Sequence, residues 1–199
     1  YFLDDDVVPD PGNLRRMAET FSDPQVAMLG GPNLCPADAP VIERVFALVL
    51  AAWLAFGPSR ARYARVGRRR DSSEKELILC NLAARRQAVL KLGGFDETLY
   101  PNEENALMDG LQAEGLRLVY DPDFTAQRRP RRTLGQFARM LMTYGRGRAE
   151  QEHRTLAGLR AHLQAPDLLG ARLRKPGDKC ATGAGLHQLL GAPQALGRR

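Results

Sequence analysis

The chain has 199 residues and a formal net charge of +6 at neutral pH, and arginine supplies most of the positive charge. A chain of this length can bury the core of one domain. Its hydrophobic content of 44% and charged content of 26% are ordinary for a globular protein. The three cysteines form no Cys-x-x-Cys pair and have no histidine at ligand spacing, so they indicate neither a zinc site nor a disulfide framework.

Strands and helices alternate in the expected order of elements. Asp10 and Pro11 favour a helix start, because aspartate caps a helix and proline fits its first turn. The expected strands are 1–3, 25–29, 76–83 and 116–120 with a further edge at 124–127, and the expected helices are 11–21, 41–56, 85–92, 103–114 and 133–159, the last interrupted at Gly145 and Gly147. This alternation predicts an α/β fold with a mainly parallel sheet and flanking helices.

The stretch 41–56 (VIERVFALVLAAWLAF) is the most apolar part of the chain. It is shorter than the ~20 residues that a membrane-spanning helix needs. An arginine-rich segment follows at 60–70. The combination fits a helix in a membrane interface, with contact through residues 41–70, and it fits equally a core helix followed by a solvated basic loop. The sequence leaves these two interpretations open.

Residues 165–199 have a different composition from the rest of the chain. Gly, Pro, Ala and Arg dominate there, and the apolar residues lose clear periodicity. We therefore expect a folded domain over residues 1–164 and a poorly ordered tail over 165–199, with at most a short helix near 186–190. Because the chain starts without methionine and inside an expected strand, we also expect it to be a fragment whose N-terminal part is missing.

Three consecutive acids, Asp4, Asp5 and Asp6, follow the first expected strand. Carboxylates are costly to place beside buried apolar residues unless a cation pairs with them. Side chains alternate along a strand, so Asp4 and Asp6 are expected to share one face while Asp5 points away. Oxygen ligands favour a hard cation, so this pair predicts a Mg²⁺ or Mn²⁺ site that also binds a diphosphate. The alternative is a solvated polar turn.

A second acidic pair, Glu103 and Glu104, begins the expected helix 103–114. A carboxylate across a crevice from a metal-bound diphosphate can take the proton of an attacking hydroxyl group. Open α/β sheets bind ligands in such a crevice at the strand ends. The helix dipole alone also favours acids at a helix N-terminus, and this simpler interpretation suits Glu103 better. The arginines at 128–132 would either face phosphate groups or remain solvated.

Several segments together resemble the family 2 glycosyltransferases, which have a GT-A fold. The stretch FLDDDVVPDPGNLRRM resembles the DxD segment of that family, and LGGFDETLYPNEENALMDGLQAEGLRLVYDPD resembles its GGFDE…ED segment. More narrowly, GGPNLCPADAP, ELILCNLAARR, LYPNEEN and YGRGRAEQ are similar to the succinoglycan-type transferases that build exopolysaccharides. The resemblance implies a nucleotide-diphospho-sugar transferase fold. The fold would be partial, because the half that grips the nucleotide base would precede Tyr1.

The resemblance implies an inverting glycosyltransferase of the hexosyltransferase type. Asp4 and Asp6 would hold Mg²⁺ or Mn²⁺, and Glu104 would be the catalytic base. Contacts to donor or acceptor would come from Asp5, Asp96, Glu103, Arg128 and Arg129. The implied donor is a nucleotide sugar, with UDP as the expected nucleotide, and the acceptor is lipid-linked or a saccharide. The implied setting is cell-surface polysaccharide synthesis in the cytoplasm, at the inner face of the plasma membrane.

Two other functions fit the same sequence. A non-catalytic basic module would use the arginine clusters at 60–70 and 128–132 to bind nucleic acid or an anionic membrane surface. Because no helix-turn-helix, RRM-like or zinc pattern is present, nucleic acid is the less favoured partner. The other alternative is an inactive transferase fragment, because the expected nucleotide-binding half is missing.

Overall fold

The structure, a computed structural model, describes residues 1–164 except residue 101, and within 150–164 it describes the side chain of His153 alone. The chain divides into two compact units, Tyr1–Thr155 and Leu156–Arg199. The described part of the second unit is the end of a helix. The tail expected at 165–199 lies outside the described residues.

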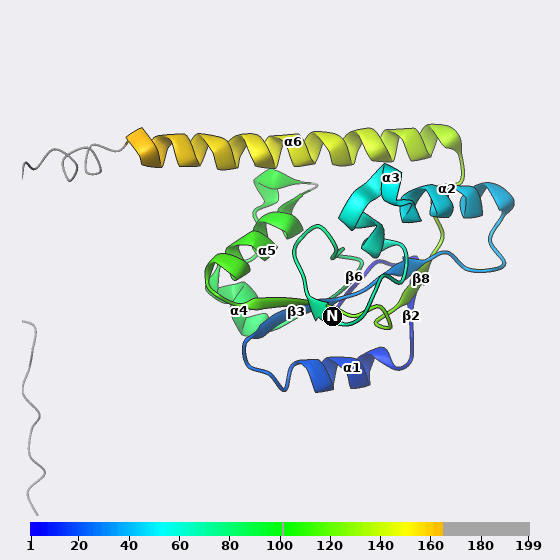
Figure 1. The fold of residues 1–199 in the computed structure, drawn as a ribbon, viewed down its shortest axis with the longest axis horizontal. Coiled ribbons are helices and arrows are strands. Elements are labelled where there is room, and N and C mark those ends of the chain that lie inside the picture. The colour runs from blue at the N-terminus through cyan, green and yellow to red at the C-terminus, as the bar shows by residue number, and fades with distance from the viewer. Residues whose placement is uncertain (101, 165–199) are drawn as a thin grey trace, which may run out of the picture. The chain divides into compact units, whose positions relative to one another are not determined.

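The described elements confirm the α/β class (Figure 1). The strands are β1 (Phe2–Leu3), β2 (Val7–Pro9), β3 (Val26–Gly30), β4 (Asn33–Leu34), β5 (Arg70–Asp71), β6 (Asn81–Ala84), β7 (Arg117–Tyr120) and β8 (Ala126–Arg128). The helices are α1 (Asn13–Thr20), α2 (Val41–Ala51), α3 (Trp53–Phe56), α4 (Arg86–Lys91), α5 (Glu103–Ala113) and α6 (Leu134–Gln164), with 3₁₀ helices η1 (Gly57–Arg62) and η2 (Glu97–Leu99).

The strands form two mixed sheets, so the prediction of a mainly parallel sheet is wrong. The larger sheet has the order β1-β6-β3-β7-β5, and the smaller has the order β2-β8-β4. Only β3 with β7 and β4 with β8 pair in parallel among the described strands, and the other neighbours are antiparallel. Two neighbouring strands run parallel only when a crossover connection returns the chain to the end of the sheet where the first strand began. The largely irregular segment between η1 and β6 instead returns the chain so that β6 runs against β3.

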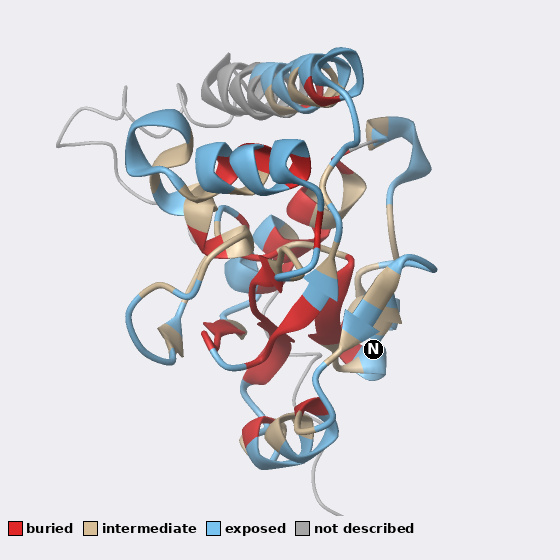
Figure 2. Ribbon diagram, turned by 90° about the vertical axis from the view of Figure 1, so that its right-hand side faces the viewer, coloured by how far each residue is buried: buried red, intermediate tan, exposed pale blue. Residues whose placement is uncertain are grey.

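The core lies on both faces of the larger sheet. All five residues of β3 are buried. Met28 and Leu118 pack in a cluster with α4 and α5, whereas their neighbours Leu29 and Val119 pack in a second cluster with α1. Figure 1 accordingly shows α1 on one side of the sheet and α5 on the other, and Figure 2 shows the buried strands between them. The continuous apolar run of β3 is typical of a strand that is covered on both faces.

Three expected elements differ from the structure. The apolar stretch 76–83 becomes a strand only at β6, and Leu77 is buried from an irregular segment between two turns instead. The expected helix 41–56 is broken at Ala52, whose ψ of 131° is extended. Helix α6 runs without a break through Gly145 and Gly147, which were expected to interrupt it. Glycine weakens a helix by only about 1 kcal/mol, so neighbouring turns and tertiary packing can sustain it.

A buried polar network anchors the start of the chain. The Tyr1 hydroxyl donates to Oδ1 of the fully buried Asn81 at 2.7 Å, and Nδ2 of Asn81 donates to the carbonyl of Phe124 at 2.8 Å. Nδ2 of Asn13 donates to the Tyr1 hydroxyl and to the carbonyl of Thr125, both at 2.9 Å. The interior carbonyls of the loop before β8 are thereby satisfied. The network fixes β1, α1 and this loop against one another, next to the acidic turn.

Candidate functional site

The carboxylates of Asp4 and Asp6 converge on the guanidinium group of Arg128. Nη2 of Arg128 lies 2.8 Å from Asp4, and its Nε lies 3.1 Å from Asp6. The acids occupy the turn between β1 and β2, and Asp5 is exposed in the same turn. The expected alternation along a strand therefore does not apply to them. Strand β2 pairs with β8, with Val7 opposite Arg128, and this pairing brings the arginine to the acids.

Arg128 is a firmly charged centre. Burial lowers its pKa, but Cys80, Asp4 and Asp6 raise it by more, and the net pKa lies above the ordinary value. Burial raises the pKa of the Cys80 thiol, which accepts a hydrogen bond from Nδ2 of Asn33 at 2.9 Å. The acidic turn therefore contacts a charged guanidinium group, and the buried thiol of Cys80 acts on the same guanidinium.

The Asp4–Asp6 pair fits a Mg²⁺ or Mn²⁺ ion whose remaining ligands come from a substrate and from water. In the part of the chain that the structure describes, no group of three or more His, Cys, Asp or Glu side chains gathers at one point. Mg²⁺, however, is usually held by one or two carboxylates, with substrate phosphates and waters as its other ligands. The two side chains are 42% and 51% exposed, so both are accessible from solvent. A metal ion there would compete with Arg128 for the same oxygens.

Replacing Arg128 by Gln is expected to increase the affinity for Mn²⁺ in the absence of donor by about three- to tenfold. The change removes a cation that competes for Asp4 and Asp6, and unpaired carboxylates attract a divalent ion more strongly. Titration calorimetry measures the effect. Arg129→Gln is the matched control, because Arg129 contacts Asp38 at 3.5 Å and leaves the acidic pair untouched. Equal Mn²⁺ affinity in the two variants would contradict the competition.

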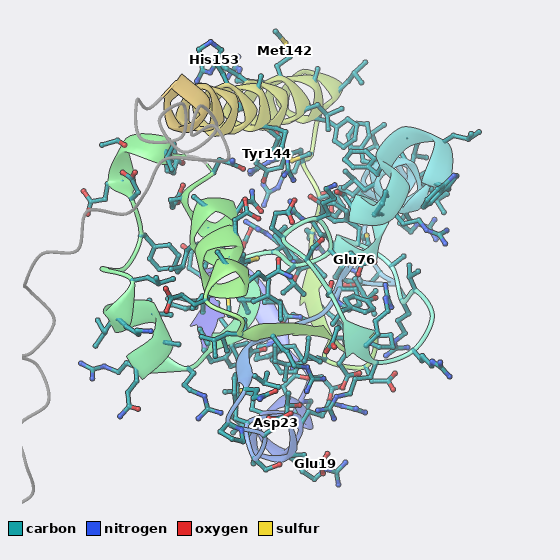
Figure 3. All side chains as sticks on the ribbon, turned by 60° about the vertical axis from the view of Figure 1, so that its left-hand side comes forward. Glu19, Asp23, Glu76, Met142, Tyr144 and His153 are labelled. Atoms are coloured by element: carbon teal, nitrogen blue, oxygen red, sulfur yellow. The ribbon has the colours of Figure 1, made fainter. Side chains whose placement is uncertain are left out.

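A cleft of about 700 Å³ opens beside the acidic turn. Its described lining includes Asp6, Tyr100, Arg129, Arg131, Arg132, Gln136, Arg139, Thr143 and Tyr144. Four arginines and one acid make this lining positive, and guanidinium groups bind phosphates in a bidentate manner. Tyr144 points from α6 toward the rest of the domain, whereas Met142 and His153 point away from it (Figure 3). The cleft therefore suits an anionic ligand such as a diphosphate.

Glu104 lies half-buried in the first turn of α5. Burial raises its pKa above the ordinary value of 4.5, and nearby Glu103 adds to this effect, while a backbone hydrogen bond and the charges of Arg62 and Arg148 oppose it. Other groups hold these two arginines, because Arg62 donates to Asn105 at 3.0 Å and Arg148 contacts Glu74 at 3.1 Å. A carboxylate with a raised pKa accepts a proton more readily than an exposed one, which is a property that a general base requires.

Tyr144 lines the cleft from α6. Its pKa is raised, chiefly by burial. The charge of Arg128 opposes this rise, and the charge of Glu104 adds to it. Tyr144 lines the cleft together with Asp6, whereas Glu104 is not among the described residues that line it. The structure therefore brings Asp6 and Tyr144 together at the cleft and leaves Glu104 outside its described lining.

The remaining predicted site residues, Asp96, Glu103 and Arg129, lie in different surroundings. Asp96 accepts a hydrogen bond from the backbone N–H of Thr98 at 3.0 Å and caps η2, so its side chain organises this turn. Glu103 is half-buried, and its Oε2 has no hydrogen-bond partner among the described residues. Arg129 lines the cleft.

Sequence reasoning gave no role to Tyr144, Arg148 or Arg62. The first two lie within YGRGRAEQ, one of the segments that carry the family resemblance, so a signal for them existed. Arg62 stands among many arginines, and nothing in the sequence distinguishes it from its neighbours.

Comparison with known proteins leaves the family of this chain open. No protein-family model matches the sequence. No curated protein matches it either.

Proposed function

We propose that this chain is the C-terminal part of a family 2 glycosyltransferase domain with a partial GT-A fold. It would transfer a sugar, with inversion, from a UDP-linked donor to a lipid-linked or saccharide acceptor in cell-surface polysaccharide synthesis. The proposed location is the cytoplasm, at the inner face of the plasma membrane. The observation that supports the proposal most directly is the convergence of Asp4 and Asp6 on the guanidinium group of Arg128, beside an arginine-lined cleft.

The proposed reaction assigns a separate task to each acidic group. The acceptor oxygen forms a bond to the anomeric carbon, and the bond from that carbon to the diphosphate breaks, so its electron pair leaves with the diphosphate. Glu104 takes the proton of the acceptor hydroxyl group. Asp4 and Asp6 would hold the divalent ion, which when bound neutralises charge on the leaving diphosphate. Arginines of the cleft would bind the same phosphates, because their guanidinium groups match phosphate geometry.

Titration of UDP into the protein, with and without Mn²⁺, tests this proposal. We expect binding to require the metal, and we expect Asp4→Asn/Asp6→Asn to weaken the metal-dependent binding by at least about tenfold, because the double variant removes both carboxylate ligands. Asp10→Asn is the control, since it removes a carboxylate four residues along the chain, which accepts from the backbone N–H of Gly12, and leaves both contacts to Arg128 in place. Metal-dependent UDP binding that survives in the double variant would remove the assignment of these two residues.

A non-catalytic anion-binding module is the second candidate, and the four arginines of the cleft favour it. Such a module would bind UDP and inorganic diphosphate with similar affinity and without Mn²⁺. Its binding would fall as the salt concentration rises, because exposed guanidinium groups are screened. The same titration, repeated with inorganic diphosphate, distinguishes the two candidates.

A further inference from the structure

Helices α2 and α3 present an exposed apolar face. Val41 is 68% exposed, Leu48 is 71% exposed and Leu54 is wholly exposed, with Trp53 at 59%. Ile42 and Val45 are also nearly half exposed, and spacings of three and four residues place these side chains on one side of α2. A groove of about 510 Å³ between α2 and residues 35–37 adjoins this face. Contiguous apolar surface of this kind usually marks an interaction site.

The opposite side of α2 is already occupied. Phe46 and Leu50 are buried in a cluster with Phe137 of α6, and the rings of Phe46 and Phe137 stack with centroids 4.4 Å apart. Helix α2 therefore needs no further packing to stay in the domain. Its outward apolar residues do not contribute to the core, so folding alone does not explain them.

Two arginines, Arg44 and Arg60, border the apolar face. Glu43, the one acid between residues 41 and 70, is buried. Arg60 lies over the ring of Trp53, with the guanidinium carbon 5.6 Å from the ring centroid. Arg44 is exposed and lines the groove together with Val45 and Leu48. Leucine, valine and tryptophan beside arginines form the chemical pattern of a surface that lies in the interface of an anionic bilayer.

We propose that the face formed by Val41, Val45, Leu48, Trp53 and Leu54 docks on an anionic lipid surface. In the part of the chain that the structure describes, no single helix is long and apolar enough to cross a membrane, and only α2 together with Trp53–Arg62, bent by 64°, passes that test as a pair. The proposed contact is peripheral: apolar side chains enter the headgroup region and arginines pair with lipid phosphates. It does not depend on the proposed transferase activity.

A lipid surface suits this face better than a second copy of the chain does. A symmetric contact between two copies would bring two sets of the same arginines together, and like charges oppose such a contact. An anionic bilayer supplies the opposite charge over a wide area. The full exposure of Leu54 at the start of α3 also suits insertion into a fluid interface, which adapts its shape to a projecting side chain.

Trp53 provides a direct measurement, because it is the only tryptophan in the chain and it lies in the proposed contact. Vesicles of phosphatidylglycerol and phosphatidylcholine are expected to shift its emission to the blue and to sediment the protein, whereas pure phosphatidylcholine vesicles do neither. Leu48→Glu/Leu54→Glu should weaken vesicle binding by at least about tenfold, since two apolar contacts are lost. Leu14→Glu/Leu90→Glu adds the same charge at exposed leucines of α1 and α4, and it should bind the anionic vesicles like the wild type.

Three results would overturn the proposal. In the first, the wild-type protein fails to bind anionic vesicles at low salt. In a second, the two double variants lose binding equally, so that added charge rather than the face explains the effect. In a third, sedimentation velocity shows a dimer that Leu48→Glu/Leu54→Glu alone dissociates, so that a second copy covers the face. Circular dichroism of both double variants verifies that each is folded.

Discussion

Glu104→Gln is expected to lower sugar transfer by at least about a hundredfold in a protein that contains the complete donor site, because a positioned general base contributes that much or more. The substitution keeps the size of the side chain and removes its capacity to accept a proton. The pKa of Glu104 is raised, chiefly by burial, so the ionised base is lost as the pH falls through that raised value, and transfer by the wild type should fall with it. Radiolabelled sugar incorporation over a range of pH measures both effects.

Glu104→Gln should lower sugar transfer without lowering the stability of the fold. A carboxyl group whose pKa is raised in the folded state contributes stability that is present below its ordinary pKa and is lost as the pH rises through the raised value. At neutral pH the variant should therefore melt at the same temperature as the wild type or higher. Loss of transfer with no loss of stability would identify Glu104 as a residue kept for chemistry.

Glu103→Gln is the matched control for this experiment. It removes a carboxylate from the same first turn of α5, so it alters the favourable interaction with the helix dipole to a similar extent. We expect it to retain transfer within a few-fold. If both variants lost activity and stability together, the acidic pair would serve to start the helix, and the assignment of Glu104 as the base would be wrong.

Gly31→Ala is expected to destabilise the fold by about 3 kcal/mol or more, the largest effect on stability that we predict. A Cβ atom at Gly31 would lie 2.1 Å from the carbonyl oxygen of Phe124 and 2.5 Å from that of Asp121. These are backbone atoms next to β8, so they cannot rotate away as a flexible side chain does. Urea denaturation monitored by circular dichroism measures the loss.

Gly145→Ala is the control for Gly31→Ala, because a Cβ atom at Gly145 meets nothing within 4 Å. That change should stabilise the protein by up to about 1 kcal/mol, since alanine favours a helix over glycine. If Gly31→Ala had no effect on stability, the close approach of the two backbone segments would be refuted.

Local sequence patterns predicted the elements well where a single signal was strong. The apolar run of β3, the double-glycine stop after α4 and the acidic start of α5 all correspond to observed elements. The same patterns failed where tertiary packing decided the outcome. Leu77 belongs to an apolar run that resembles a strand, yet it fills the core from an irregular segment, and periodicity cannot distinguish these cases. The break at Ala52 has no glycine or proline to announce it.

The sequence pointed to some members of the candidate site and not to their arrangement. Asp4, Asp6, Glu104 and Arg128 were all singled out from the sequence. Their alternation along a strand was not the reason why the two aspartates converge, because both occupy a turn. The convergence results from the antiparallel pairing of β2 with β8. These two strands are far apart in the sequence, because Val7 pairs with Arg128. Sequence patterns of short range contain no information about that register.

The central position of β3 has a consequence for how the protein folds. Both neighbours of β3 come late in the chain, since Gly30 pairs with Leu82 on one side and with Tyr120 on the other. A strand buried on both faces must therefore wait for partners across most of the domain, and closing such long loops is slow. Until β7 docks, the edge of β3 that it covers exposes unpaired backbone N–H and C=O groups to other chains. Synthesis and refolding should consequently pass through a period of high aggregation risk that ends when β7 docks.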